Sequence, residues 1–454
     1  MNNQTIEREK VLLVGVDTGN GDHFDRSMEE LEQLAQACEM EPVGIITQKL
    51  DHKGGPTYVG SGKIEEVKTY AGTCEADIVI VNDDLSPSQI RNLSDSLDLP
   101  VTDRTGLILD IFSRRAKTAE AKLQVETASL TYLLPRLVGM RKYLGRQRGT
   151  SGAMSNRGAG ETKLELDRRK IQHRISTLRK ELEELEGNRV LQRKKRMESL
   201  IPQVALVGYT NAGKSTIMNR MLSLCQEKEE KLVYEEDMLF ATLDTSVRRI
   251  DTGDRKPFLL TDTVGFIHNL PHGLIQAFRS TLEEVKYADL LVQVIDFSDA
   301  ESARAMEVTA KTLKELGAAD IPMLYVYNKC DKVATKEESE ETEHSNILVF
   351  RKFPKDGERT LYLSATSQGG DEDGIKRLLW KIKELLYAKQ VIATFLIPYD
   401  KGSEVSYLRE NTSVLSSEYL EEGVLLCVSA NTEMLARLSE YAVKEGDSLE
   451  SIDP

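Results

Sequence analysis

The first hundred residues alternate short apolar runs with amphipathic stretches. Apolar runs at residues 11–16, 43–47 and 77–81 predict buried strands. Residues 27–38, 63–71 and 86–97 have the spacing of amphipathic helices. Strands that alternate with helices are typical of a parallel sheet, so we predict a small parallel α/β unit over residues 1–103.

From about residue 104 the pattern becomes that of long helices. Residues 115–134 contain few helix breakers. After a basic, glycine-rich stretch, heptad-like spacing of apolar side chains follows at Leu164, Ile171, Ile175, Leu178, Leu182 and Leu185. Two such helices joined by a loop are expected to fold back as an antiparallel hairpin over residues 104–198.

A second α/β pattern begins near residue 199. Apolar runs at residues 204–207, 258–260, 290–295, 323–327 and 361–363 predict the strands of a domain over residues 199–388. The remainder, 389–454, reads as strand, helix, strand, strand and a last helix at 433–441, hence a small α+β domain. The fold class is therefore α/β multidomain.

Composition indicates a soluble globular protein, since 40% of the 454 residues are hydrophobic and 30% are charged. The N-terminal ten residues are polar, and no run approaches the ~20 apolar residues that cross a bilayer. The five cysteines lack metal-type spacing. We expect a cytoplasmic protein with reduced thiols; a monomer is the simplest expectation, although the sequence does not fix the oligomeric state.

Charge is distributed unevenly along the chain. The net charge is −14, yet residues 113–197 carry 22 Lys and Arg against 9 Asp and Glu. The rest of the chain carries 38 basic and 65 acidic residues. Such asymmetry favours a basic segment that faces a polyanion.

A phosphate-binding loop follows the predicted strand 204–207. Its residues are Gly208, Tyr209, Thr210, Asn211, Ala212, Gly213, Lys214, Ser215 and Thr216. Glycines let backbone N–H groups surround phosphates, Lys214 brings a cation to the β and γ phosphates, and Ser215 offers a hydroxyl to Mg²⁺. This loop serves ATPases and GTPases equally.

The base is specified further along the chain. Asn328, Lys329, Cys330 and Asp331 follow the predicted strand 323–327, and a carboxylate at Asp331 can accept the paired N–H donors of guanine, which adenine lacks. Ser364, Ala365 and Thr366 follow another strand and can contact the base from the far side. The substrate and product are therefore predicted to be GTP and GDP.

Between these motifs lie Asp262, Thr263, Val264 and Gly265, again after an apolar run. Asp262 would hold Mg²⁺ through water, and the Gly265 amide can meet the γ-phosphate. A further Mg²⁺ ligand is expected in a switch loop, where Thr242 and Thr245 are both candidates by residue type.

Four motifs resemble the HflX family of ribosome-associated GTPases over most of the chain. They are residues 103–112 with Asp103, Arg104 and Thr105, Leu134 to Leu137, Arg157 to Glu165, and the switch segment Phe240, Ala241, Thr242, Leu243 and Asp244. The resemblance implies that Thr242 completes the Mg²⁺ shell and that the catalytic residues are Lys214, Thr242 and Gly265. Phe266 stands where many GTPases have a water-orienting glutamine, so we expect slow basal hydrolysis raised by a partner.

The loop of the predicted hairpin is basic, with Arg141, Lys142, Arg146, Arg148 and Arg157 and no acidic residue. From the sequence alone it is equally an RNA-binding tip or a solvated loop. The resemblance implies binding to the large ribosomal subunit and its rRNA, and the splitting or rescue of stalled or idle ribosomes. An assembly GTPase for large subunits and a switch that binds a protein partner remain alternatives.

A second glycine motif, residues 60–63, resembles a fragment of a phosphate loop. Ile64 stands where that loop needs Ser or Thr, so a helix-capping turn is the expected role.

Overall fold

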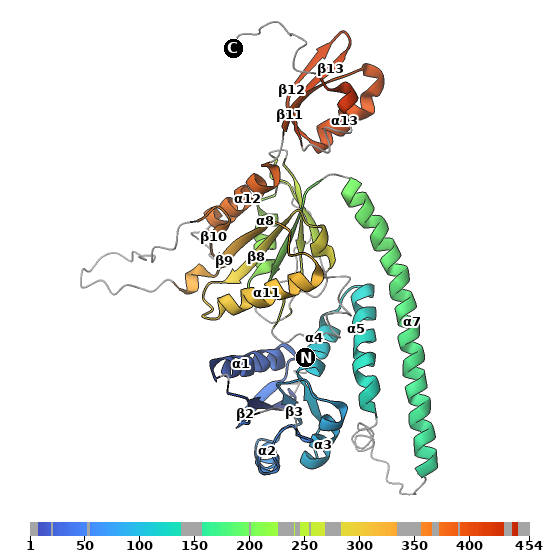
Figure 1. Cartoon of the computed structure of the whole chain (residues 1–454), viewed down its shortest axis with the longest axis vertical. Coiled ribbons are helices and arrows are strands. Elements are labelled where there is room, and N and C mark those ends of the chain that lie inside the picture. Colours follow the sequence, from blue (N-terminus) through green and yellow to red (C-terminus); the bar gives the residue numbers. More distant parts are fainter. Residues whose placement is uncertain are drawn as a thin grey trace, which may run out of the picture. The chain divides into compact units, whose positions relative to one another are not determined.

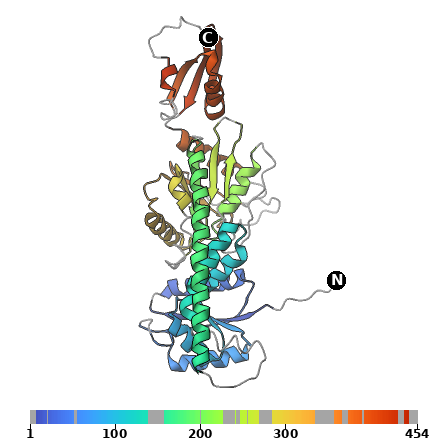
Figure 2. The ribbon, with the colours of Figure 1, turned by 90° about the vertical axis from the view of Figure 1, so that its right-hand side faces the viewer.

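The computed structural model describes residues 8–19, 21–51, 55–137, 157–198, 201–225, 240, 246–253, 256–267, 283–333, 356–365, 372–388, 391–430 and 438–443. These residues form three sheets with their helices (Figures 1 and 2). Each part is described by itself below.

The N-terminal sheet is parallel, with the order β2-β1-β3-β4. Its strands are β1 (Lys10–Asp17), β2 (Glu41–Lys49), β3 (Ile78–Val81) and β4 (Val101–Asp103). The connecting helices are α1 (Gly21–Ala37), α2 (Ser61–Thr73) and α3 (Pro87–Leu97). The predicted parallel α/β unit is confirmed, with a short fourth strand that the sequence analysis did not predict.

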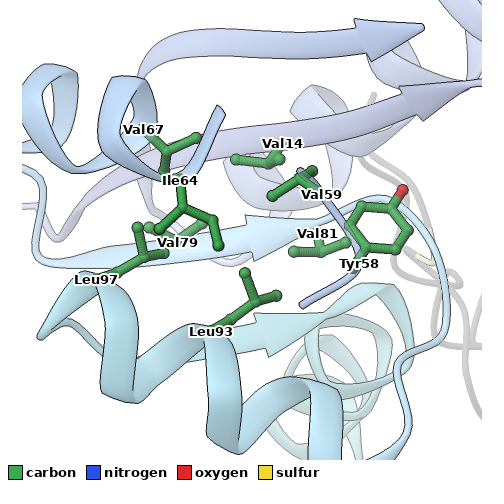
Figure 3. A pocket seen from close by; sticks show the side chains of 9 residues that line it. All are labelled: Val14, Tyr58, Val59, Ile64, Val67, Val79, Val81, Leu93 and Leu97. Atoms are coloured by element: carbon green, nitrogen blue, oxygen red, sulfur yellow. The ribbon is translucent and has the colours of Figure 1, made fainter. Parts of the chain in front are cut away.

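This sheet packs around a closed apolar core. Figure 3 shows a cavity in this core, about 10 Å³ in volume and lined by valine, leucine, isoleucine and Tyr58. The Tyr58 ring lines this cavity, but its hydroxyl forms hydrogen bonds at the carboxyl edge of the sheet. It accepts a hydrogen bond from the Val16 amide (3.0 Å) and donates one to Asp83. The cavity is large enough for one water at most, so it is a packing defect and no ligand site.

The turn at residues 60–63 caps α2, as expected. The Gly60 amide donates to Gln48 Oε1 at 3.0 Å, and Lys63 forms an ion pair with Glu66 at 2.7 Å. Lys63 is therefore engaged with a side chain of its own helix.

Helix α4 (Arg104–Arg115) follows β4 directly, and eight of its 12 residues are buried. Asp103, fully buried, caps its N-terminus by accepting from the Gly106 amide at 2.9 Å. The same carboxylate accepts from Tyr132 (2.7 Å) and pairs with Arg136 (3.3 Å). Several of the motif residues at 103–112 and 134–137 thus have a structural role, in which one buried carboxylate joins the sheet, α4 and the next helix.

The long helices are α5 (Ala119–Leu133), which continues into a 3₁₀ turn Leu134–Arg136, and α7 (Arg157–Glu198). They run side by side (Figures 1 and 2). Ile175 and Leu178 are buried, and Arg174 forms two hydrogen bonds with Glu126 of α5 at 2.7 and 2.9 Å. The predicted hairpin is confirmed, and its apolar seam is buried at Ile175 and Leu178. The first predicted helix, 115–134, begins four residues later, because Thr118 caps α5.

The second sheet has the order β10-β9-β8-β5-β7-β6. Its strands are β5 (Gln203–Gly208), β6 (Ser246–Ile250), β7 (Phe258–Asp262), β8 (Leu290–Asp296), β9 (Met323–Asn328) and β10 (Thr360–Tyr362). Only β6 is antiparallel to its neighbour. Helices α8 (Lys214–Ser223), α11 (Ser302–Leu316) and α12 (Glu372–Tyr387) belong to this domain, together with a 3₁₀ turn Glu283–Tyr287. The pattern confirms the predicted second α/β unit.

The C-terminal sheet is antiparallel, with the order β11-β13-β12. It comprises β11 (Val391–Ile397), β12 (Ser413–Leu420) and β13 (Gly423–Ala430), with α13 (Gly402–Asn411) over one face. Where the structure describes the predicted last helix, residues 438–443, it has a 3₁₀ turn Ser439–Tyr441 and an isolated bridge from Ala442 to Phe395. That part of the helix prediction was wrong.

Two further sequence expectations can be compared with the structure. All five cysteines carry free thiols. In the part of the chain that is described, no helix combines the length and apolarity that a membrane span requires.

Candidate nucleotide-binding site

The carboxyl edge of the second sheet brings the central motifs together. Strand β5 lies between β7 and β8, with Leu206 opposite Asp262 and Gly208 opposite Val294. Asp296 at the end of β8 lies opposite Asn328 at the end of β9. Because parallel strands end at one edge, motifs up to 120 residues apart in the sequence meet there.

The phosphate loop requires its glycines. Gly208 has φ +139°, and a Cβ there would lie 2.3 Å from the Val294 carbonyl oxygen. Gly213 has φ +96°, and its Cβ would lie 2.3 Å from Asn328 Nδ2. Only glycine fits either position, since both a left-handed backbone and close contact are required.

Lys214 begins α8 and is buried. Its ammonium donates to the carbonyls of Gly208 (3.2 Å) and Tyr209 (2.8 Å). Burial lowers the pKa of Lys214 to about 8, helped by the positive charge of Lys329 and opposed by the carboxylate of Asp262. A cation held at a helix N-terminus in this way is suited to bind an anion.

Ser215 and Asp262 form the oxygen pair expected of a Mg²⁺ site. The Ser215 hydroxyl donates to Asp262 Oδ2 at 2.7 Å, and Asp262 is fully buried. The adjacent Thr263 hydroxyl donates to the Leu206 carbonyl at 2.6 Å, which fixes the end of β7. Hydroxyl and carboxylate oxygens at this separation fit a hard cation that keeps several waters and takes its remaining ligands from a phosphate. Among the described residues, no group of three or more His, Cys, Asp or Glu side chains could hold a metal ion.

Asn328 connects the base side of the site to the phosphate loop. Its Nδ2 donates to the Ala212 carbonyl at 2.9 Å, and its Oδ1 accepts from the Ala365 amide at 2.9 Å. The side chain is buried, so losing it would leave both partners unpaired. Asn328 therefore fixes the phosphate loop relative to the segment around Ala365, and these two bonds leave its second Nδ2 hydrogen and second Oδ1 lone pair for other contacts.

Lys329 has a left-handed backbone, φ +60°, and pairs with Asp296 at 2.9 Å. Burial alone would raise the pKa of Asp296, but hydrogen bonds from Ser298 and Lys329 hold it below its ordinary value. The sequence analysis did not single out Asp296. Asp296 could have been predicted as a site residue from its position at the end of an apolar run, which it shares with Asp262.

Asp331 follows in a one-turn 3₁₀ helix, Cys330–Lys332, and is exposed. Its carboxylate accepts a hydrogen bond from the buried Ser364 hydroxyl. Cys330 is buried, and its amide donates to the Leu363 carbonyl at 3.3 Å. An exposed carboxylate held in place from behind can present its other oxygen lone pairs to a base.

Comparisons with known proteins match most of this chain. Three family models match successive parts of the chain: "GTP-binding GTPase N-terminal" at residues 25–113, "GTP-binding GTPase Middle Region" at 115–196 and "50S ribosome-binding GTPase" at 203–329. The GTPase HflX of Caldanaerobacter subterraneus subsp. tengcongensis is 41% identical over 96% of this chain and 94% of its own length. The chain belongs to the HflX family of GTPases.

The GTPase HflX of Escherichia coli is a further relative of this HflX-family chain, 38% identical over 88% of each protein. Among solved structures, a GTP-binding protein from Sulfolobus solfataricus in complex with GDP is 24% identical and covers 83% of this chain and 98% of its own, with a TM-score of 0.41.

Several predicted site residues of this HflX-family chain are not placed with the phosphate loop. Val264, Gly265 and the buried Phe266 are described, as is Phe240, and these fall in the compact unit that contains the N-terminal domain. Ala241, Thr242, Leu243, Asp244 and Thr366 lie outside the described residues, as do Arg141, Lys142, Arg146 and Arg148. Arg157 begins α7, although its side chain lies outside the described part.

Proposed function

We propose that this HflX-family GTPase acts on the large ribosomal subunit, hydrolysing GTP with Mg²⁺ and splitting or rescuing stalled or idle ribosomes. The observation that carries the proposal is the match of residues 203–329 to a family described as a 50S ribosome-binding GTPase. The basic segment 113–197 in an otherwise acidic chain supports it, because rRNA is the polyanion of a ribosome.

The roles of the site residues follow from the contacts above. Gly208 to Thr216 would bind the phosphates, with the Lys214 cation beside them. Ser215 and Asp262, with Thr242 in the GTP state, would hold Mg²⁺, which supplies charge stabilisation on the transferred phosphoryl group. Asp331, supported by Ser364, would select guanine, and the remaining residues of that side would be Asn328, Lys329, Cys330, Ala365 and Thr366.

Hydrolysis is proposed to depend on a partner. The catalytic residues are Lys214, Thr242 and the Gly265 amide, which would meet the γ-phosphate. Phe266 is buried and apolar, so it cannot orient an attacking water. Basal turnover would therefore be slow, and contact with the subunit would raise it by ordering the switch segments.

The hairpin would carry the rRNA contacts at its tip, through Arg141, Lys142, Arg146, Arg148 and Arg157. Within this proposal the chain is cytoplasmic and monomeric, and its domains are residues 1–103, 104–198, 199–388 and 389–454. Helix α4 lies at the first boundary and packs with the N-terminal domain.

Cosedimentation tests the proposal. We expect the protein to pellet with purified large subunits in the presence of a non-hydrolysable GTP analogue, and to lose most of this binding when Arg141, Arg146 and Arg148 are changed to Gln. The matched control changes Arg168, Arg169 and Lys170 of α7 to Gln, which removes equal charge away from the tip. Binding to precursor particles in preference to mature subunits would favour an assembly factor. No binding to either would overturn the ribosomal proposal and favour a protein partner.

A further inference from the structure

Phe240 is a buried aromatic residue in the switch segment between α8 and β6. Only 2% of its surface is exposed, and its backbone has φ +55°, an uncommon conformation for a residue other than glycine. Such a conformation persists only where the surrounding structure fixes it. The residue lies two positions before Thr242, the proposed Mg²⁺ ligand.

The partner of Phe240 is Phe112, near the C-terminal end of α4. The ring centroids are 4.7 Å apart and the rings are nearly perpendicular, at 84°, which is the favourable edge-to-face arrangement. Both residues fall in the compact unit that contains the N-terminal domain. A residue that the sequence places inside the GTPase domain thus packs with the N-terminal domain.

Phe112 is itself held firmly. It is 1% exposed, and three further residues of α4, Leu107, Ile108 and Ile111, are fully buried. Arg104, in the first turn of the helix, is buried and binds Glu30 and Asn82, the latter at 3.1 Å. Because α4 is fixed at its start and along its length, the Phe112 ring is a rigid surface against which the switch segment can be placed.

We infer that Phe112 is a positioning residue for GTP hydrolysis: by fixing Phe240, it restrains the chain two residues before Thr242, the proposed Mg²⁺ ligand. The inference rests on the proposed role of Thr242. Ordering a switch segment around GTP costs conformational entropy. A segment that is already fixed at Phe240 loses less of this entropy when GTP binds. GDP binding does not need that ordering, so the contact should matter for GTP and not for GDP.

The test is a double-mutant cycle with Phe112→Ala, Phe240→Ala and the double variant. We expect each single change to lower the single-turnover rate of GTP hydrolysis and the affinity for a non-hydrolysable GTP analogue with Mg²⁺ by about tenfold. GDP affinity should stay within about twofold of wild type, and the double variant should be no worse than either single one. Phe112→Leu, which keeps an apolar side chain, should recover part of the loss.

Leu107→Ala is the control, since it removes an equally buried side chain from the same helix. It should lower the melting temperature while leaving the ratio of GTP-analogue to GDP affinity unchanged. Additive losses in the double variant, an unchanged ratio in Phe112→Ala, or faster hydrolysis in either single variant would overturn the inference. If Phe112→Ala does not fold, the ratio of GTP-analogue to GDP affinity is measured in Phe240→Ala and Phe112→Leu instead, and an unchanged ratio in both would overturn the inference.

Thr242→Ala is measured in parallel. If it retains Mg²⁺-dependent hydrolysis, the proposed role of Thr242 fails, whatever the phenylalanine variants show.

Discussion

At the scale of single residues, the candidate site contains two kinds of side chain: those proposed to bind the ligand and those that keep the binding side chains in position. Lys214 and Ser215 are the residues proposed to bind the phosphates and the cation, whereas the contacts of Asn328 and Ser364 hold neighbouring parts of the site in place. The sequence predicts the first kind from spacing, because the chemistry requires those residue types. It does not reveal that Asn328 bonds to the phosphate loop 116 residues away, since only the register of β8 and β9 brings them together.

Base selection is the first prediction at this scale. Asp331→Asn replaces an oxygen acceptor by an amide donor, which should lower GTP affinity by at least about 100-fold and raise affinity for XTP, whose ring offers a carbonyl at that edge. Competition binding with GTP, XTP and ATP measures this. Asp320→Asn, at an exposed site, is the control and should change nothing. Retained preference for GTP in Asp331→Asn would remove Asp331 from the base site.

The second prediction at this scale concerns the proton that Lys214 binds or releases. Its pKa is lowered to about 8 by burial, so below pH 8 the free protein carries a charged ammonium there, and above it the amine is increasingly neutral. Bound phosphates would restore the charge, so GDP binding should take up a proton and weaken as pH rises from about 8 to 9. Without ligand, this residue's contribution to stability should rise over the same range, because the folded state gives up its proton before the unfolded chain does.

Titrations with a fluorescent GDP between pH 7 and about 8.8 measure the linkage, below the range in which guanine itself ionises. Lys214→Arg keeps its charge at every pH used and should show a flatter profile, whatever its absolute affinity. A wild-type affinity that is constant across this range would contradict the assigned pKa shift.

At the scale of elements, the strongly patterned segments were predictable and the short or half-polar ones were not. The apolar runs of β5, β8 and β9 gave their strands directly. Strand β6 was missed because Ser246–Ile250 contains two arginines and lies at the sheet edge, where only one end is buried. Helices α4 and α5 are separated where Thr118 caps the N-terminus of α5, although the surrounding sequence has a helical pattern. Local propensity cannot tell such a cap from a helical threonine.

The phosphate loop gives a prediction at this scale. Gly213→Ala introduces a Cβ 2.3 Å from Asn328 Nδ2 in a left-handed backbone, so the loop or Asn328 must move. We expect nucleotide affinity to fall at least about tenfold and stability to fall by about 1–3 kcal/mol. Gly317→Ala is matched in backbone, φ +72°, but its Cβ meets nothing within 4 Å. It should cost stability alone, measured by thermal unfolding, and leave GDP binding unchanged; equal binding losses in both would refute a local role for Gly213.

The helical hairpin gives a second prediction at the scale of elements. Leu178 is fully buried in the seam of α7, so Leu178→Ala should destabilise the hairpin by about 2–5 kcal/mol. The Arg174 and Glu126 pair is exposed, and Arg174→Ala should have little effect despite its two short hydrogen bonds. Hydrogen exchange along α5 and α7 distinguishes them. A larger loss of protection from Arg174→Ala would mean that the ion pair, and not the seam, holds the helices together.

At the scale of the whole molecule, one acidic chain combines a candidate nucleotide site with a basic hairpin. The family is established by relatives that match nearly the full length of the chain. The phenylalanine contact between α4 and the switch segment offers a physical route by which the N-terminal domain can influence hydrolysis. Neither feature is visible in composition alone, which gives only a net charge of −14.

The most direct test of this account is GTP turnover by the purified protein, alone and with purified large ribosomal subunits, at low and high salt. The account predicts slow turnover alone, a many-fold rise with subunits, and loss of that rise as salt weakens the basic contacts. Fast turnover by the isolated protein, or no response to subunits at any salt concentration, would contradict it.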